Sequence, residues 1–115
     1  MYKKRYKKTI LIDLDGVLNQ YDGSYDKDVI PPIKYGAREF LEVLNEVFKI
    51  VIFTTRPVKL TSEWLDKNNI NQYVYDITNV KIPAFLIVDD RAICYNGNYD
   101  ETLNKIINFV VHWKN

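Results

Sequence analysis

Short runs of apolar residues alternate along the chain with segments that have helical periodicity. The apolar runs at residues 9–14, 49–53 and 85–88 have the length and β-branched content of buried strands. Apolar residues recur at helical spacing after Gly36, and a second helix is expected from Thr61. This alternation predicts βαβ units built around a parallel sheet.

Weaker signals complete the expected order of elements. Residues 73–77 suggest a short strand, and apolar residues on one side predict a last helix over residues 102–113. Thr61 is the expected N-cap of the second helix, which should end at the asparagine pair 68–69. The segment 19–35 is a loop of about 17 residues, which is too long to be idle in a compact domain.

The length of 115 residues is typical of one domain, so we expect a single domain over residues 1–115. Lys and Arg number 16 and Asp and Glu number 15, so no global charge excess attracts nucleic acid or membranes. Cys94 is the only cysteine, which excludes an intrachain disulfide, and we expect it to be a small buried hydrophobe. No apolar stretch has the length of a membrane span or a signal-peptide core, and a cytoplasmic protein is expected.

The charge is nevertheless uneven along the chain. Five basic residues lie within residues 1–8, which form a basic N-terminal arm. Such an arm would suit the phosphates of nucleic acid or an acidic partner. The plain alternative is a solvated leader to the first strand. Both interpretations stay open from the sequence.

Reactive polar side chains follow three of the expected strands. Asp13 and Asp15 end the first strand, Thr54 ends the second, and Asp89-Asp90 follow the third. The carboxyl ends of parallel strands meet at one edge of the sheet, where open α/β folds bind ligands. Carboxylates crowded there repel one another unless a cation lies between them, and Mg²⁺ prefers oxygen ligands. The sequence therefore predicts a magnesium site that includes Asp13, Asp15, Asp89 and Asp90.

Neutral and positive groups near these strand ends point to phosphate chemistry. Thr54 offers a hydroxyl, and Lys81 offers a positive charge before the third strand. Both suit phosphoryl oxygens, which need donors as charge moves in the transition state. An aspartate is able to act as a nucleophile through an acyl phosphate. The residues alone thus suggest metal-assisted phosphoryl transfer.

Four ordered segments resemble the motifs of the haloacid-dehalogenase-like (HAD) phosphohydrolases. Residues 13–18, DLDGVL, match the first motif, DxDx[TV][LV], in full. The second motif resembles the strand that ends at Thr54, the third is Lys81, and the fourth resembles the strand that ends in Asp89-Asp90. The resemblance implies a three-layer α/β/α Rossmann-like (HAD-like) domain with a parallel sheet.

Residues 81–92 also resemble a small HAD branch with a KPxA…IDDRA pattern, in which Ile82 replaces the usual proline. Neither the 19–35 loop nor the segment between Thr54 and Lys81 is long enough for a cap domain. The resemblance therefore implies a form with a minimal cap or none. Such a site would be open to a bulky substrate or screened by the loop alone.

The resemblance also assigns roles. Asp13 would be the nucleophile that becomes an aspartyl-phosphate, and Asp15 would protonate the leaving oxygen and then deprotonate water. Thr54 would bond the phosphoryl oxygens, and Lys81 would neutralise their charge. The remaining residues fall into two sets: Thr55, Arg56 and Gly16 would contact the substrate, and Asp89 and Asp90 would complete the Mg²⁺ shell, with the direct ligand of the two left open.

The sequence favours a Mg²⁺-dependent phosphatase acting on a phosphorylated partner. Two alternatives stay open. The expected lack of a cap domain, together with Arg56 and the basic arm, favours a polynucleotide-end phosphatase. The basic arm alone would fit a non-catalytic module that binds phosphate or nucleic acid. His112, the only histidine, is expected to be a packing or surface residue.

Overall fold

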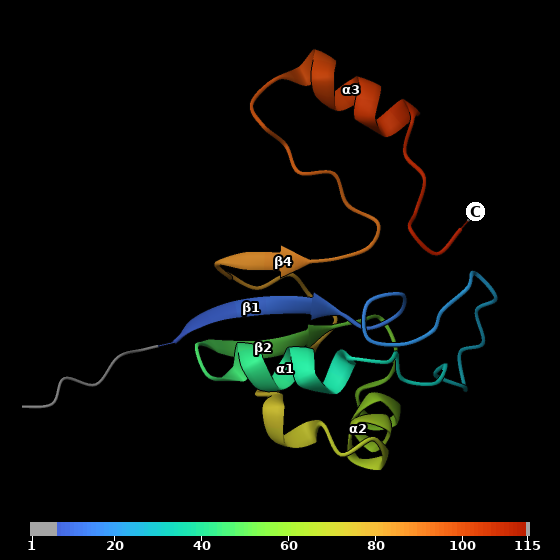
Figure 1. Ribbon diagram of the computed structural model, residues 1–115, viewed down its shortest axis with the longest axis vertical. Coiled ribbons are helices and arrows are strands. Elements are labelled where there is room, and N and C mark those ends of the chain that lie inside the picture. Colours follow the sequence, from blue (N-terminus) through green and yellow to red (C-terminus); the bar gives the residue numbers. More distant parts are fainter. Residues whose placement is uncertain (1–6, 115) are drawn as a thin grey trace, which may run out of the picture.

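The computed structural model describes residues 7–114, so the first six residues of the predicted basic arm lie outside the described part. Within it, four parallel strands form one sheet in the order β3-β2-β1-β4 (Figure 1). No helix of residues 7–114 has the length and apolar character needed to cross a membrane. The elements are β1 (Lys8–Asp13), α1 (Ala37–Asn45), β2 (Phe48–Phe53), α2 (Val58–Lys67), the 3-10 helix η1 (Asn71–Tyr73), β3 (Asp76–Thr78), β4 (Leu86–Val88) and α3 (Tyr99–Ile107).

One face of the sheet carries the hydrophobic core. Alternate residues of a strand point to the same side, and on this side β1 and β2 contribute four isoleucines that are almost fully buried. Helices α1 and α2 close this face. The shared core of strands and helices includes Ile10, Ile12, Ile50, Ile52, Leu41, Trp64 and Leu65.

The strand order reverses between β1 and β4. Successive strands β1, β2 and β3 lie side by side, whereas β4 returns to the free side of β1. The connection from β3 to β4, residues 79–85, contains no helix. The right-handed rule for parallel strands would place it on the face opposite α1 and α2. Ligand sites of open α/β sheets form beyond the strand ends at such a reversal, which here lies between β1 and β4.

Helix α3 does not form the expected third layer. It lies beyond β4, apart from the sheet (Figure 1), and makes no extensive contact with another described helix or strand. The segment after β4 leads away from the sheet (Figure 1), although Leu11 and Val51 on the face opposite α1 and α2 are also buried. The α/β class and the parallel sheet are therefore confirmed, but the predicted three-layer arrangement is wrong for the described chain.

The ends of several elements differ from their predicted positions. Helix α2 begins at Val58, and Thr61 is not its N-cap but lies inside it, where its hydroxyl donates to the Pro57 carbonyl at 3.0 Å. Pro57 presets the backbone angle at the helix start and needs no hydrogen-bond partner for its nitrogen, so the helix starts earlier. The last helix ends at Ile107, and Cys94 is exposed instead of buried.

A candidate metal site at the strand ends

The carboxyl ends of three strands meet around one cavity of about 190 Å³. Asp13 at the end of β1, Thr54 after β2 and Asp89 after β4 all line this cavity, together with Asp15 and Thr55. Parallel pairing keeps the three strand ends level with one another. The prediction that these distant stretches of chain converge is confirmed.

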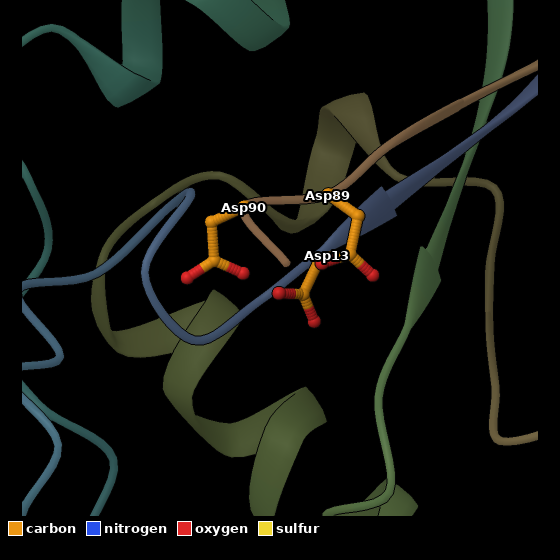
Figure 2. Close-up of side chains that lie close together, drawn as sticks. All are labelled: Asp13, Asp89 and Asp90. Carbon is orange, nitrogen blue, oxygen red and sulfur yellow. The ribbon is translucent and has the colours of Figure 1, made fainter. Parts of the chain in front are cut away.

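Three carboxylates lie close together at this edge (Figure 2). Asp13, Asp89 and Asp90 each offer one oxygen atom, and these atoms lie within 4.8 Å of one another. Burial raises the pKa of Asp13 to about 8, assisted by a hydrogen bond with Asp90 and by the negative charges of Asp89 and Asp90. Without a cation, this acidic trio therefore retains a proton at neutral pH, because carboxylates at this distance repel one another.

Asp90 is tightly held within the acidic trio. Its Oδ2 atom accepts a hydrogen bond from the indole Nε1 of Trp113 at 2.5 Å. Burial disfavours the charge on Asp90, but hydrogen bonds from Trp113 and Asp13 outweigh it and lower the pKa of Asp90. The Oδ1 atom is buried and accepts no hydrogen bond from an N–H or hydroxyl group of residues 7–114, so the proton that the trio retains is the only donor left to it. An oxygen ligand without an N–H or hydroxyl donor, in a trio with excess negative charge, fits a hard divalent cation such as Mg²⁺.

The last described residues fold back onto the loop after β1. The Trp113 ring packs edge-on against Tyr21 with ring centroids 5.1 Å apart, and His112 Nε2 lies 2.7 Å from the carbonyl oxygen of Gly16. A Cβ atom at Gly16 would overlap the Asp90 carboxylate, and its φ of 84° favours glycine. Gly16 is thus needed for the approach of Asp90 and does not line the cavity, and its contact with a substrate stays a prediction.

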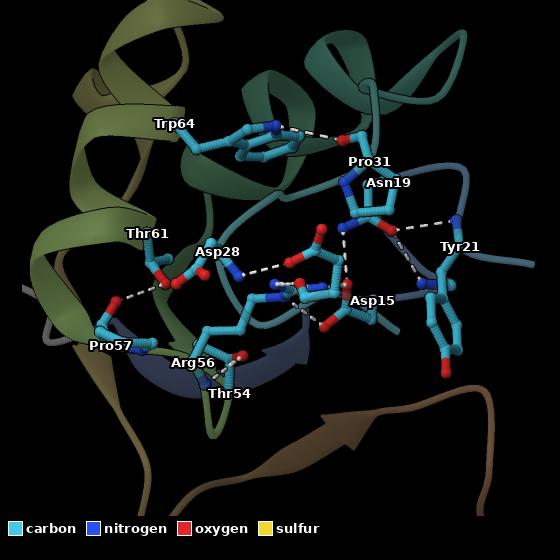
Figure 3. A network of polar contacts seen from close by, with 12 residues as sticks. Asp15, Asn19, Tyr21, Asp28, Pro31, Thr54, Arg56, Pro57, Thr61 and Trp64 are labelled. Atoms are coloured by element: carbon cyan, nitrogen blue, oxygen red, sulfur yellow. Dashed lines mark hydrogen bonds and ion pairs between the residues drawn. The ribbon is translucent and has the colours of Figure 1, made fainter. Parts of the chain in front are cut away.

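Asp15 lies two residues from Asp13 but in a different environment (Figure 3). Arg56 donates to it through Nε at 2.9 Å from Oδ2 and through Nη2 at 3.1 Å from Oδ1, and Asn19 donates to Oδ1 at 3.0 Å. Arg56 is 2% exposed, and its Nη1 donates to the Asp26 carbonyl at 2.8 Å. It therefore positions Asp15 and does not line the cavity, and its contact with a substrate stays a prediction. The Asp15 carboxylate turns the guanidinium inward because opposite charges pair strongly where water is excluded.

The 19–35 loop covers one side of the cavity. Tyr21 and Tyr25 from this loop line it, and the Tyr25 ring lies 4.6 Å from the guanidinium carbon of Arg56. A bridge between Asn19 and Ile33 closes the base of the loop. Asn19 is fully buried, and its side-chain oxygen accepts from two backbone N–H groups of the turn after β1. The length of the loop predicts a function for it, but no motif in the sequence marks Asn19 or Trp113 as part of the site.

Lys81 and Arg91, the basic residues on either side of β4, differ in their position relative to the cavity. Lys81 is exposed and does not line the cavity. Arg91, which follows Asp90 in the sequence, does line it. Lys81 lies in residues 79–85, a segment without a helix or strand before β4. Thr54 is buried and its hydroxyl oxygen accepts from the backbone N–H of Arg56 at 3.2 Å, which leaves its own proton for a ligand. Among the described lining residues, the positive charge therefore comes from Arg91.

Comparison with known proteins bears on the fold alone. No protein-family model matches the chain, and no curated protein matches it. The conserved protein coded by a locus of Bacteroides thetaiotaomicron has a similar structure, with a TM-score of 0.59 and 19% sequence identity. The similarity covers 89% of this chain and 91% of that chain. It supports a Rossmann-like α/β fold for this protein.

Proposed function

We propose that this protein is a HAD-like, Mg²⁺-dependent phosphatase that hydrolyses a phosphate monoester through an aspartyl-phosphate on Asp13. The observation that carries the proposal is the meeting of the acidic trio with Thr54 at the strand ends. Carboxylates suit a divalent cation, and the hydroxyl suits a phosphoryl oxygen. The order of the four sequence motifs supports the family, because each motif falls at a strand end or before a strand.

The reaction needs two different tasks from the aspartates. Asp13, Asp89 and Asp90 would hold the cation, which would neutralise the trio and polarise the phosphoryl group. The Asp13 carboxylate would attack phosphorus as the bond to the leaving oxygen breaks. Asp15, which Arg56 and Asn19 hold as a carboxylate, would first take a proton from solvent and then give it to that oxygen. Asp15 then takes a proton from the water that attacks the aspartyl-phosphate, and inorganic phosphate leaves. Its contacts with Arg56 hold Asp15 at the cavity wall for both proton transfers.

The transferring phosphoryl oxygens need donors as their charge changes. We assign them to the Thr54 hydroxyl, whose proton is not used by the protein, and to the Arg91 guanidinium. Arg91 takes the part that the sequence resemblance assigned to Lys81. Tyr21 and Tyr25 bound the side of the cavity where the leaving alcohol would extend, so the 19–35 loop would set the substrate preference.

Hydrolysis of p-nitrophenyl phosphate in the presence of Mg²⁺ tests the proposed activity. The wild type should turn over, and Asp13→Asn should lose about a thousand-fold or more of kcat, because the nucleophile is gone. Asp66→Asn, the same change at an exposed position on α2, should keep full activity. Activity of Asp13→Asn close to that of the wild type would exclude an aspartyl-phosphate. Phosphate binding without turnover across a broad panel of esters would favour the non-catalytic module.

The cation is tested separately from activity. The chain has two tryptophans, so Trp113 is the only one left in a Trp64→Phe variant. Because its indole donates to Asp90, binding of Mg²⁺ should change its fluorescence in a saturable way. Asp90→Asn in the same background should abolish the change. An unchanged signal up to millimolar Mg²⁺, with normal binding of Mg²⁺ by calorimetry, would place the ion away from Asp90.

A further inference from the structure

Residues 91–110 form an arm that leaves the domain after β4 and returns to it at Val111. The base of this arm is fastened, because Trp113 donates to Asp90, the residue directly before it. Val111 is buried at the point of return. The arm carries α3, which lies away from the sheet (Figure 1). Both ends of the arm are thus attached to the domain while its middle is not.

The apolar side chains of α3 have little cover within residues 7–114. Leu103, Ile106 and Ile107 are 56%, 55% and 79% exposed. A helix of nine residues is marginal in water and depends on packing of its apolar side. Inside the arm, Ile106 and Phe109 line a small hollow of about 170 Å³, but the outer surface of the helix stays bare. The helix therefore needs a second surface to pack on.

Strand β4 offers a surface of matching character. It is an edge strand of the sheet, and Phe85, Leu86 and Ile87 at this edge are 58%, 48% and 36% exposed. Proteins cover such apolar edges, often with a helix, because an open edge recruits other chains. Each chain thus displays an uncovered apolar helix and an uncovered apolar strand, and the arm keeps the two apart.

We propose that the protein is a two-fold symmetric dimer in which α3 of each subunit packs on β4 of the other. A two-fold axis applies the same contact twice, so one arrangement covers both helices and both strands. The exposed area agrees with this partner. The chain exposes 8554 Å², whereas a compact monomer of 13.6 kDa exposes about 6,600 Å². The excess, taken over the whole chain, is large enough to include the ~800 Å² that each subunit buries in a standard interface.

Light scattering after size-exclusion chromatography measures the assembly of the full chain. The wild type at tens of micromolar should have about twice the mass of the 13.6-kDa chain. Leu103→Lys combined with Ile107→Lys should give a monomer, because each change places a charge in the apolar contact. Asn104→Lys combined with Asn108→Lys adds two charges at the same spacing, on the side of α3 turned away from Leu103 and Ile106, and should leave the dimer intact. Circular dichroism confirms that each variant is folded. A monomeric wild type, with the arm closed on its own β4 or open, would overturn the proposal.

A cross-link identifies the surfaces involved. Two variants are made in a Cys94→Ala background, one with Leu86→Cys on β4 and one with Ile107→Cys on α3. If the contact is reciprocal between subunits, oxidation of the mixture should join the two different chains. Each variant alone should give much less cross-linked product. A dimer that yields no mixed product would show that another surface holds it, and would also overturn the proposal. Neither experiment depends on phosphatase activity.

Discussion

Asp13 and Asp15 are separated by one residue, yet the fold treats their charges in opposite ways. The Arg56 guanidinium and Asn19 occupy the oxygens of Asp15, so its charge is compensated inside the protein. Asp13 faces Asp89 and Asp90 instead, and burial with these neighbours raises its pKa to about 8. The acidic edge of the sheet therefore has two parts. One carboxylate is fixed in place by the protein, and the other three need a cation to be charged together.

The largest effect should follow from removing the partner of Asp15. Arg56→Met leaves a mostly buried carboxylate without compensation, and breaking such a pair costs about 3–5 kcal/mol of unfolding free energy. The melting temperature should fall by more than about 10 °C, measured by calorimetry without Mg²⁺. The catalytic rate should fall as well, because Asp15 loses its fixed orientation.

Arg38→Met is the matched control for this change, since Arg38 is exposed on α1. It should alter the melting temperature by no more than about 2 °C. Equal effects of the two substitutions would mean that Arg56 does not compensate Asp15, and the distinction between the two carboxylates would then fail.

The convergence of the strand ends was predictable from the sequence because it depends on local patterns. Each strand is a continuous apolar run that ends in a polar residue, as at Asp13, Thr54 and Asp89. Parallel pairing then brings those ends to one edge whatever the details of the loops. The acidic trio is thus a consequence of two short segments and one topological rule, which also brings Thr54 beside it from a third segment.

The contacts that distinguish the carboxylates were not predictable in this way. Arg56 turns inward because the 19–35 loop supplies an acceptor at Asp26, and no periodicity encodes that meeting. Trp113 reaches Asp90 only after the excursion of the whole arm, while its sequence pattern suggested the continuation of a helix. The apolar side of α3 predicts that this side of the helix is buried, but it does not predict which surface covers it. Long-range contacts of single side chains decide these cases.

A second, smaller effect should follow from reducing the charge of the acidic trio. The unfolded chain releases the Asp13 proton near its ordinary pKa of 3.8, whereas the native state keeps it up to about pH 8. Between these values the native state binds more protons, so the stability of the metal-free wild type should fall as the pH rises. Asp13→Asn lacks this proton. In EDTA its melting temperature should gain on that of the wild type steadily between pH 4 and 8, by several degrees at least.

Asp66→Asn controls for the loss of one negative charge, because Asp66 is exposed on α2. Its melting temperature should follow that of the wild type at every pH. A constant difference between Asp13→Asn and the wild type across this range would contradict the shared proton. Mg²⁺ should reverse the order at pH 8, since the ion stabilises only the chain that retains all three carboxylates.

The smallest effect concerns the indole that holds Asp90. Trp113→Phe removes the donor to Oδ2 of Asp90. The carboxylate then rotates more freely, and its charged form loses the hydrogen bond that stabilises it. Binding of Mg²⁺, measured by calorimetry, should weaken about tenfold, which corresponds to roughly 1.4 kcal/mol. The value of kcat at saturating Mg²⁺ should change little, because Trp113 does not line the cavity. Trp64→Phe removes an equivalent donor, which bonds the Pro31 carbonyl at 3.2 Å, and should leave Mg²⁺ affinity unchanged. If both variants bind Mg²⁺ as the wild type does, the hydrogen bond from Trp113 is not needed to orient Asp90 for the ion. Trp113 would then serve only to attach the arm to the domain.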